Sequence, residues 1–234
     1  MAIIPAKLTS RRLVRKNLAL LFERPLLSYT LAAARLTPSI SKTIVSSESP
    51  VVHKLAVRYG AQSHHRSEAL CQPDVTNQKV IEAVLEEERI AGEVPDYVVL
   101  LQPTHPLRRP RDLARAIDLF QLHDEADCLM TVAPVDLLLG EIDADGLLIP
   151  ERDLRIPKRQ RAQRYRNTGS FYLFRPSRTL DEGRLFGSKI LPFIMEHPEF
   201  EVDIDYATDL ERADALLRAN LHHFNDLIED IDSV

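Results

Sequence analysis

The chain has 234 residues, which suits one globular domain, and 44% of them are hydrophobic, enough to bury a substantial core. Its formal net charge of −5 argues against general nucleic-acid binding, because affinity for a phosphate backbone requires a cationic surface. No apolar run is long enough to span a membrane, nothing reads as a secretory signal, and Cys71 and Cys128 lie too far apart for a CxxC pair. We therefore expect a reduced, cytoplasmic protein that binds neither nucleic acid nor a membrane.

Apolar, β-branched segments alternate with segments of helical periodicity along most of the chain. Pro25, Pro50 and Pro110 stand at predicted helix starts, and Gly60 and Gly92 at predicted helix ends. Strands are predicted over 2–5, 42–47, 96–102 and 127–135. Helices are predicted over 25–36, 50–59, 77–91 and 110–123. This alternation predicts a mostly parallel, doubly wound α/β sheet.

The alternation breaks between about 136 and 168. There "DADG" (143–146) is typical of a hairpin turn, and "PKRQRAQRYR" (157–166) is basic and irregular. Strand-like "GSFYLFR" and "KILPFIM" follow. We expect a single domain over 1–234, with a lobe at about 136–168 that is inserted into, or projects from, the α/β core.

The stretch "AIIPAKLTSRRLVRKNL" (2–18) joins the first strand to a loop without acidic residues or glycines. Its cations are Lys7, Arg11, Arg12, Arg15 and Lys16. Ligands of open α/β sheets bind beyond the carboxyl ends of the strands, where this loop lies. Long lysine and arginine side chains can hold a triphosphate while the backbone stands farther off. Taken alone, the run fits a solvated basic loop equally well.

The segment "EVDIDYATDLERAD" (201–214) places two aspartates before a predicted helix. On a strand, Asp203 and Asp205 would share one face, where their carboxylates repel each other unless a cation lies between them. Mg²⁺ suits such a pair, since it takes one or two carboxylates and completes its shell with water and substrate phosphates. Asp205 could instead cap the helix, but Thr208 and Glu211 can form a capping box and leave both aspartates free. We favour the metal site.

Two further polar groups follow a buried strand in "LLQPTHPLRRP" (100–110). Gln102 and Arg108 are delivered to the same sheet edge. The alternative is a proline-stiffened turn with Arg108 at the surface, where we expect Arg109 and Arg111. The histidines form no ligand set, so we expect no zinc, and we find no arrangement for a nucleophile.

Four motifs, in order, resemble those of the acylneuraminate (CMP-sialic acid) cytidylyltransferases. "IIPAKLTSRRLVRKNL" is similar to the family's "IPARxxSKxxxxKNL", "RSEAL" to "RPxEL", "LLQPTHPLR" to "LLQPTSPLR", and "VDIDYATDL" to "xDIDxxxDL". The match runs from about Ala2 to Arg218. Each motif alone is weak, but four at the right spacing are strong.

The resemblance implies a Rossmann-like α/β nucleotidyltransferase fold and usually a homodimer, with the irregular middle lobe making the dimer contact. It implies transfer of CMP from CTP to the anomeric hydroxyl of a sialic-acid-like nonulosonic acid, with Mg²⁺ as cofactor and pyrophosphate as the second product. The acid sugar is an anion, which gives a second reason for cations in a net-acidic chain.

The resemblance also implies residue roles. The expected nucleotide-binding residues are Lys7, Ser10, Arg11, Lys16, Asn17, Arg66 and Thr76, with Lys7 and Lys16 also acting in catalysis. The expected sugar-binding residues are Gln102, Arg108 and Arg166, and Arg166 would reach across the dimer. The expected metal ligands are Asp203 and Asp205.

The chain departs from the family at several positions. Lys7 replaces an arginine and loses its two-pronged phosphate geometry, though not its charge. His105 stands where serine is usual, "NTG" replaces "NG" before a strand, and Glu141 lies near the place of a frequent lysine. The nucleotide half is thus nearly intact and the sugar half is altered. An octulosonate (Kdo) cytidylyltransferase and a catalytically weak nucleotide-binding homologue remain alternatives.

Overall fold

A computed structural model of the chain describes residues 1–10, 12–151, 153, 155–180 and 184–234. Arg11, which was predicted to bind the nucleotide, lies outside the described residues. No helix in the described part of the chain is long and apolar enough to cross a membrane.

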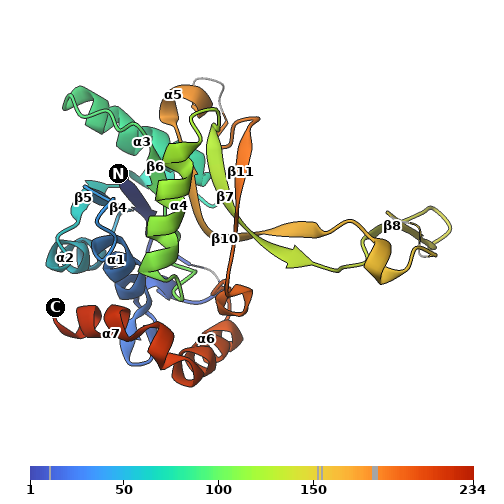
Figure 1. Cartoon of the computed structure of the whole chain (residues 1–234). Coiled ribbons are helices and arrows are strands. Elements are labelled where there is room, and N and C mark those ends of the chain that lie inside the picture. Colours follow the sequence, from blue (N-terminus) through green and yellow to red (C-terminus); the bar gives the residue numbers. More distant parts are fainter. Residues whose placement is uncertain (11, 152, 154, 181–183) are drawn as a thin grey trace.

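The centre of the molecule is a seven-stranded sheet with the strand order β11-β7-β10-β6-β1-β4-β5 (Figure 1). Strand β10 runs antiparallel to both of its neighbours, and the other neighbouring pairs are parallel. The mostly parallel sheet predicted from the sequence is therefore confirmed. Its strands are β1 (Ala2–Pro5), β4 (Thr43–Ser47), β5 (Gln62–His65), β6 (Val98–Leu100), β7 (Cys128–Val135), β10 (Arg164–Phe174) and β11 (Ile190–Ile194).

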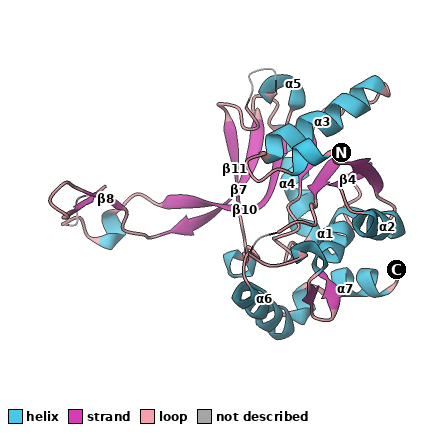
Figure 2. Cartoon of the chain, turned by 180° about the vertical axis from the view of Figure 1, so that it is seen from behind, coloured by secondary structure: helices cyan, strands magenta, loops and turns pink. Residues whose placement is uncertain are grey.

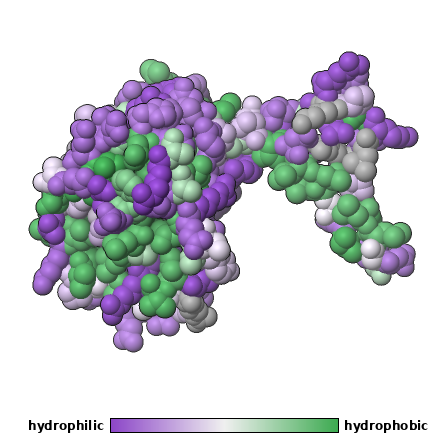
Figure 3. Space-filling model, turned by 90° about the horizontal axis from the view of Figure 1, so that it is seen from below, coloured by the Kyte–Doolittle hydropathy of each residue, from purple (hydrophilic) through white to green (hydrophobic). Residues whose placement is uncertain are grey.

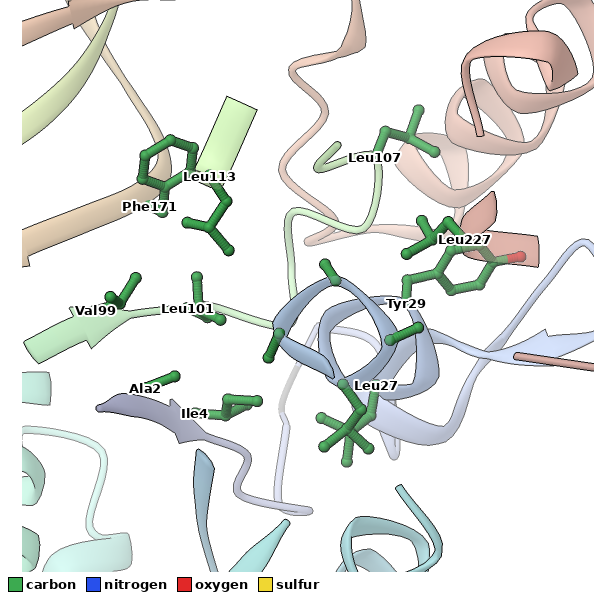
Figure 4. Packing of buried hydrophobic residues seen from close by; sticks show 14 of the residues in the cluster. Ala2, Ile4, Leu27, Tyr29, Val99, Leu101, Leu107, Leu113, Phe171 and Leu227 are labelled. Carbon is green, nitrogen blue, oxygen red and sulfur yellow. The ribbon is translucent and has the colours of Figure 1, made fainter. Parts of the chain in front are cut away.

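Helices cover both faces of this sheet because its central strands are apolar on both sides. In β1, Ala2 and Ile4 face one hydrophobic cluster and Ile3 faces the other. Figure 4 shows the first cluster, in which Leu27 of α1 and Leu113 of α4 approach β1 and β6. The helices are α1 (Leu26–Arg35), α2 (Pro50–Arg58), α3 (Asn77–Ile90), α4 (Pro110–Leu122), α5 (Pro176–Thr179), α6 (Ala207–Ala219) and α7 (Asn225–Asp232).

The helix limits follow local chemistry. Pro50 and Pro110 occupy first-turn positions of α2 and α4, where a missing N–H has no consequence. The Thr76 hydroxyl accepts a hydrogen bond from the Lys79 N–H at 3.5 Å and caps α3. Gly60 and Gly92 have φ values of 75° and 82°, the left-handed conformation that ends a helix.

A two-stranded arm projects from the sheet (Figures 1 and 2). We define the arm as residues 132–167: the end of β7, the start of β10 and the chain between them. Its far end is a hairpin of β8 (Gly140–Ile142) and β9 (Leu148–Pro150). The predicted turn at 143–146 is confirmed, since Asp143 Oδ1 accepts from the Asp145 and Leu147 N–H groups at 3.0 and 2.8 Å.

Three details differ from the sequence predictions. The strand predicted from 169 begins at Arg164, because residues 164–167 pair with the end of β7. The segment 201–205 is extended but belongs to no strand. The cap of α6 uses neither Thr208 nor Glu211: the Asp209 carboxylate accepts from the Asp205 and Tyr206 N–H groups at 2.9 and 2.8 Å.

The remaining elements are short. A small hairpin pairs β2 with β3 between the loop after β1 and helix α1. They are β2 (Leu20–Leu21), β3 (Arg24–Pro25), and the 3₁₀ turns η1 (Lys16–Leu18), η2 (Glu68–Cys71), η3 (Lys158–Gln160), η4 (Pro198–Phe200) and η5 (Leu221–His223).

Candidate active site

A large cleft lies where the chain direction across the sheet reverses. From β1 the chain proceeds to β4 and β5 on one side, and it later returns to β6 on the other side. The loops after β1 and β6 therefore diverge and leave a crevice, the usual ligand site of such sheets. The cleft has a volume of about 920 Å³. Among the predicted site residues, it is lined by Lys7, Ser10, Lys16, Asn17, Arg66, Gln102 and Asp205.

Side chains, not glycines, shape the loop after β1. Glu48 Oε1 accepts hydrogen bonds from the Leu8 and Thr9 N–H groups at 2.8 and 3.2 Å. The buried Asn17 amide donates to the Lys7 carbonyl at 2.8 Å. These contacts fix the loop from both sides while its cationic side chains extend into the cleft, as a phosphate site made from side chains requires.

Arg66 lies at the buried wall of the cleft. Its Nε donates to Ser46 Oγ at 3.3 Å, and only 4% of the residue is exposed. Nη2 is buried and has no hydrogen-bond partner among the residues that the structure describes. Burial lowers the pKa of Arg66, because the surroundings disfavour its charge. A buried donor without a partner is unfavourable, so a ligand acceptor here would be stabilising.

The predicted metal aspartates lie side by side along the extended segment 201–205. Val202 and Ile204, which alternate with the aspartates along the chain, are buried, so Asp203 and Asp205 face the opposite way. Asp205 Oδ2 lies 2.6 Å from Arg12 Nη1, and its Oδ1 lies 2.9 Å from Lys16 Nζ. The alternation of buried and solvent-facing residues that the same-face prediction requires is thus present although the segment is not a strand, and Asp205, but not Asp203, lines the cleft.

These residues offer oxygen ligands alone. Within the described residues, no group of three or more His, Cys, Asp or Glu side chains is arranged to hold a metal. Two carboxylates without nitrogen or sulfur ligands suit Mg²⁺ better than zinc.

His105 lies between Asp203 and the bulge of β10. Its Nε2 donates to the Thr168 carbonyl at 3.1 Å, and its Nδ1 lies 3.2 Å from the Thr104 hydroxyl and 3.9 Å from Asp203 Oδ1. Burial lowers the pKa of His105 to about 4, so the ring is neutral at neutral pH. It therefore holds Thr168 with its N–H and presents an acceptor toward Thr104.

A second hollow, of about 490 Å³, adjoins the cleft and shares Gln102 with it. Its wall is apolar on one side, where Tyr172, Leu185 and Phe186 lie, and it includes Thr76 at the start of α3. Thr76 thus lies beside the second hollow and does not line the larger cleft.

Arg108 lies beside Gln102 at the end of β6, as expected, but it lines neither hollow. It is 1% exposed, and its guanidinium donates to the Ser170 carbonyl, the Thr30 hydroxyl and the Gln102 carbonyl at 3.0, 3.3 and 3.1 Å. Burial lowers the pKa of Arg108 to about 9. Its contacts hold the backbone of Gln102, a positioning role instead of a direct contact.

The alternative interpretation, a turn with its arginines at the surface, is wrong for Arg109 as well as for Arg108. Arg109, expected at the surface, is 2% exposed and forms a two-pronged ion pair with Asp112, at 2.6 and 2.8 Å.

Arg166 stands on the arm, not at the cleft. Its Nη2 lies 2.7 Å from Glu201 Oε2. Burial raises the pKa of Glu201, and the neighbouring Arg166 opposes that shift. Glu141 stands on β8, at the far end of the arm (Figure 1).

Comparison with known proteins gives the reaction class. A family model described as "Cytidylyltransferase" matches residues 1–229. The chain belongs to the cytidylyltransferase family. It is accordingly a CTP-dependent nucleotidyltransferase.

Several curated cytidylyltransferases are similar in sequence. The chain is 29% identical to the CMP-N,N'-diacetyllegionaminic acid synthase of Legionella pneumophila, over 94% of the chain and 97% of that relative. It is 28% identical to an N-acylneuraminate cytidylyltransferase of Escherichia coli, over 98% of the chain and 55% of the relative. It is 24% identical to a pseudaminic acid cytidylyltransferase of Campylobacter jejuni, over 94% of the chain and 97% of the relative.

Solved structures confirm the nucleotidyltransferase fold of this cytidylyltransferase. A CMP:2-keto-3-deoxy-manno-octonic acid synthetase complexed with CTP superposes with a TM-score of 0.67 at 15% identity, over 93% of this chain and 98% of that one. A 4-diphosphocytidyl-2C-methyl-D-erythritol synthase from Anaerococcus prevotii gives 0.64 at 13% identity, over 93% and 97%.

Two residues that organise the cytidylyltransferase cleft were missed by sequence reasoning. Glu48 accepts hydrogen bonds from loop amides that are 40 and 39 positions away, so no local sequence pattern predicts this role. His105 was noted only as a departure from serine, although its place directly after a buried strand was a usable signal.

Proposed function

We propose that this cytidylyltransferase transfers CMP from CTP to the anomeric hydroxyl of a sialic-acid-like nonulosonic acid and releases pyrophosphate. The observation that carries the proposal is the cleft itself, which joins the cationic loop, the buried Arg66 and Asp205 in one space. The named acids of similar relatives, legionaminic, neuraminic and pseudaminic acid, support this class of acceptor.

CTP would lie with its triphosphate along the cationic loop and its base toward Arg66. The loop contributes Lys7, Ser10, Arg12 and Lys16 to the lining of the cleft. The unpartnered Nη2 of Arg66 would donate to an acceptor on the cytosine ring. This orientation places the α-phosphate between the loop and the aspartates.

Asp203 and Asp205 would hold Mg²⁺, since they are a pair of oxygen ligands facing one side of the chain. When bound, the metal supplies charge neutralisation at the phosphates and lowers the pKa of a hydroxyl that it contacts. The protein itself performs no covalent chemistry in such a transfer. Its residues position the two substrates, and Lys7 offsets negative charge at the α-phosphate.

The acid sugar would occupy the second hollow. Gln102 belongs to both spaces and would orient the sugar next to the nucleotide. Tyr172, Leu185 and Phe186 provide an apolar wall suited to an N-acyl group. That wall favours a nonulosonic acid over the octulosonate alternative, which has no acyl group to bury.

We further propose that the chain forms a homodimer through the arm. Leucine and isoleucine side chains are exposed along the arm, although a projecting ribbon has no core of its own to cover them (Figure 3). They are Leu137, Leu138, Leu139, Ile142, Leu147, Leu148, Ile149 and Ile156. A second copy of the arm would cover this surface and bring Arg166 toward the partner's cleft.

A substrate panel tests the proposed reaction. Purified enzyme with CTP and Mg²⁺ would be supplied in turn with neuraminic, legionaminic, pseudaminic and octulosonic acids, and both pyrophosphate and the CMP-sugar would be measured. We expect turnover with one of the nonulosonic acids. Turnover with the octulosonic acid alone would show that the acceptor is an octulosonate and not a nonulosonic acid. CTP binding without turnover of any acid would support a nucleotide-binding homologue.

A further inference from the structure

Both carboxylate oxygens of Asp205 are already engaged by cations. Arg12 Nη1 lies 2.6 Å from one oxygen, and Lys16 Nζ lies 2.9 Å from the other. A divalent cation bound at Asp205 would meet two positive charges at close range. The metal-binding face of this residue is therefore closed in the arrangement that the structure shows.

The two cations differ in how firmly they are held. The Lys16 side chain is 15% exposed, and its backbone is fixed in η1. The Arg12 side chain is 56% exposed, contacts Asp205 through a single nitrogen and lies over the Tyr206 ring, 5.6 Å from its centroid. Exposed one-pronged ion pairs are weak, so the Arg12 contact is easily exchanged.

A phosphate chain would compete for the same cations. Arg12, Lys16 and Asp205 all line the cleft in which the triphosphate is proposed to lie. Guanidinium and ammonium groups bind phosphate through charge-assisted hydrogen bonds, and a triphosphate brings more negative charge than one carboxylate. Nucleotide binding would thus withdraw Arg12 from Asp205.

We propose that Arg12 closes the metal site of the nucleotide-free enzyme and becomes a phosphate-binding residue when CTP enters. The proposal rests on the proposed function, in which the loop after β1 holds the triphosphate. Its consequence is an order of events: the nucleotide frees Asp205, which then joins the exposed Asp203 as a metal ligand. Because coupling between two sites is reciprocal, bound metal would raise the affinity for CTP by the same factor by which CTP raises the affinity for the metal. Removing Arg12 would favour the metal in the nucleotide-free enzyme and would remove a phosphate contact from CTP.

The variant Arg12→Gln tests this exchange without requiring turnover. It removes the charge and keeps most of the side-chain length. Manganese binding to the nucleotide-free enzyme would be measured by electron paramagnetic resonance, and CTP binding in EDTA by calorimetry. We expect Mn²⁺ to bind about two- to five-fold more tightly, the scale of one exposed ion pair. CTP should bind several-fold more weakly.

The matched control is Arg15→Asn. Arg15 lines the same cleft but has no ion pair with Asp205 among the described contacts, and asparagine tolerates its left-handed φ of 52°. It should weaken CTP binding without an equal gain in Mn²⁺ affinity. The gain from Arg12→Gln should also vanish in an Asp205→Asn background.

Two results would overturn the exchange: a gain in Mn²⁺ affinity no larger than that of Arg15→Asn, or a gain that persists without the Asp205 carboxylate. If the wild-type enzyme still forms a CMP-sugar in that case, cytidylyl transfer stands and the exchange fails. If Arg12→Gln binds Mn²⁺ more tightly and CTP more weakly, as expected, while no acid is turned over, the exchange stands and the proposed transfer fails.

Discussion

Position 7 presents an ammonium group to the cleft, whereas the family motif that this stretch resembles has an arginine there. Under the proposed function, its charge meets negative charge that shifts on the α-phosphate in the transition state, as a point charge without two-pronged geometry. We expect Lys7→Ala to lower kcat by about 10²-fold or more, the scale of losing one preorganised electrostatic donor. The dissociation constant for CTP should change less, because Arg12 and Lys16 still hold the phosphates in the ground state.

Lys7→Arg is the control for this position, since it keeps the charge and should retain much of the activity. Steady-state kinetics and CTP calorimetry on both variants separate a catalytic effect from a binding effect. An alanine variant that turns over like wild type would show that Lys7 is a surface cation.

Asp203 and Asp205 lead to a second prediction at the scale of single residues. Replacing either by asparagine removes the charge of a proposed metal ligand and should reduce kcat by orders of magnitude while the fold persists. Asp118→Asn, an exposed aspartate on α4, is the matched control. Thermal melts would confirm folding, and near-normal turnover of either variant at saturating Mg²⁺ would rule out the metal role.

Sequence reasoning identifies candidate residues when the pattern that marks them is local. The cations after β1 and the paired aspartates are each recognisable from a pattern of a few consecutive positions. Glu48 and Arg108 are not, because their partners are far away in sequence: Leu8 for the first, Thr30 and Ser170 for the second. Whether an arginine is buried against carbonyls or points into a cleft depends on tertiary packing.

At the scale of elements, the α/β alternation was predictable because its signals are local. Apolar periodicity, proline at helix starts and glycine at helix ends marked most of the core. The start of β10 was not predictable, since a basic run pairs as a strand only when another strand lies beside it. The segment 201–205 shows the opposite situation. Its buried and solvent-facing residues alternate as in a strand, but the segment does not pair with the sheet.

The bulge of β10 gives a prediction about an element. Gly169 has a φ of 76°, and a Cβ there would lie 3.0 Å from His105 Cε1 and Nε2. Gly169→Ala therefore adds a steric conflict to the left-handed strain of about 1–2 kcal/mol. For a chain of this size, each 1 kcal/mol lowers Tm by about 2–4 °C. We expect a larger fall than strain alone produces, and weaker binding of the acid sugar.

Gly92→Ala isolates the strain. Gly92 has a φ of 82°, and no atom of the described residues lies within 4 Å of the added Cβ, so its variant measures the backbone contribution alone. Calorimetric melts of both variants, with and without His105→Ser, would separate the two effects. Equal decreases in Tm for Gly92→Ala and Gly169→Ala would show that His105 moves away from the added Cβ without a measurable loss of stability.

At the scale of the whole molecule, the arm exposes hydrophobic side chains that no packing within the described residues of a single copy of the chain covers. Figure 3 shows hydrophobic side chains gathered along it, away from the core that the two sheet faces bury. Apolar surface of this kind is stabilised when it is removed from water, by roughly 25 cal/mol per Å². A second arm is the natural cover, since identical ribbons can pair through the same surface about a twofold axis.

The dimer prediction is tested by sedimentation velocity at micromolar concentration, where we expect a single species of twice the chain mass. Leu138 and Leu148 are 45% and 53% exposed on the arm, so changing both to aspartate places charge on the proposed interface and should yield monomers. Val57→Asp is the control, because Val57 is 63% exposed on α2, far from the arm, and its variant should remain dimeric. If Arg166 acts on the partner's sugar, the arm variant should also raise the KM for the acid while CTP binding to each monomer persists. A wild-type chain that sediments as a monomer would exclude the arm as a dimer contact and would leave Arg166 to its own Glu201.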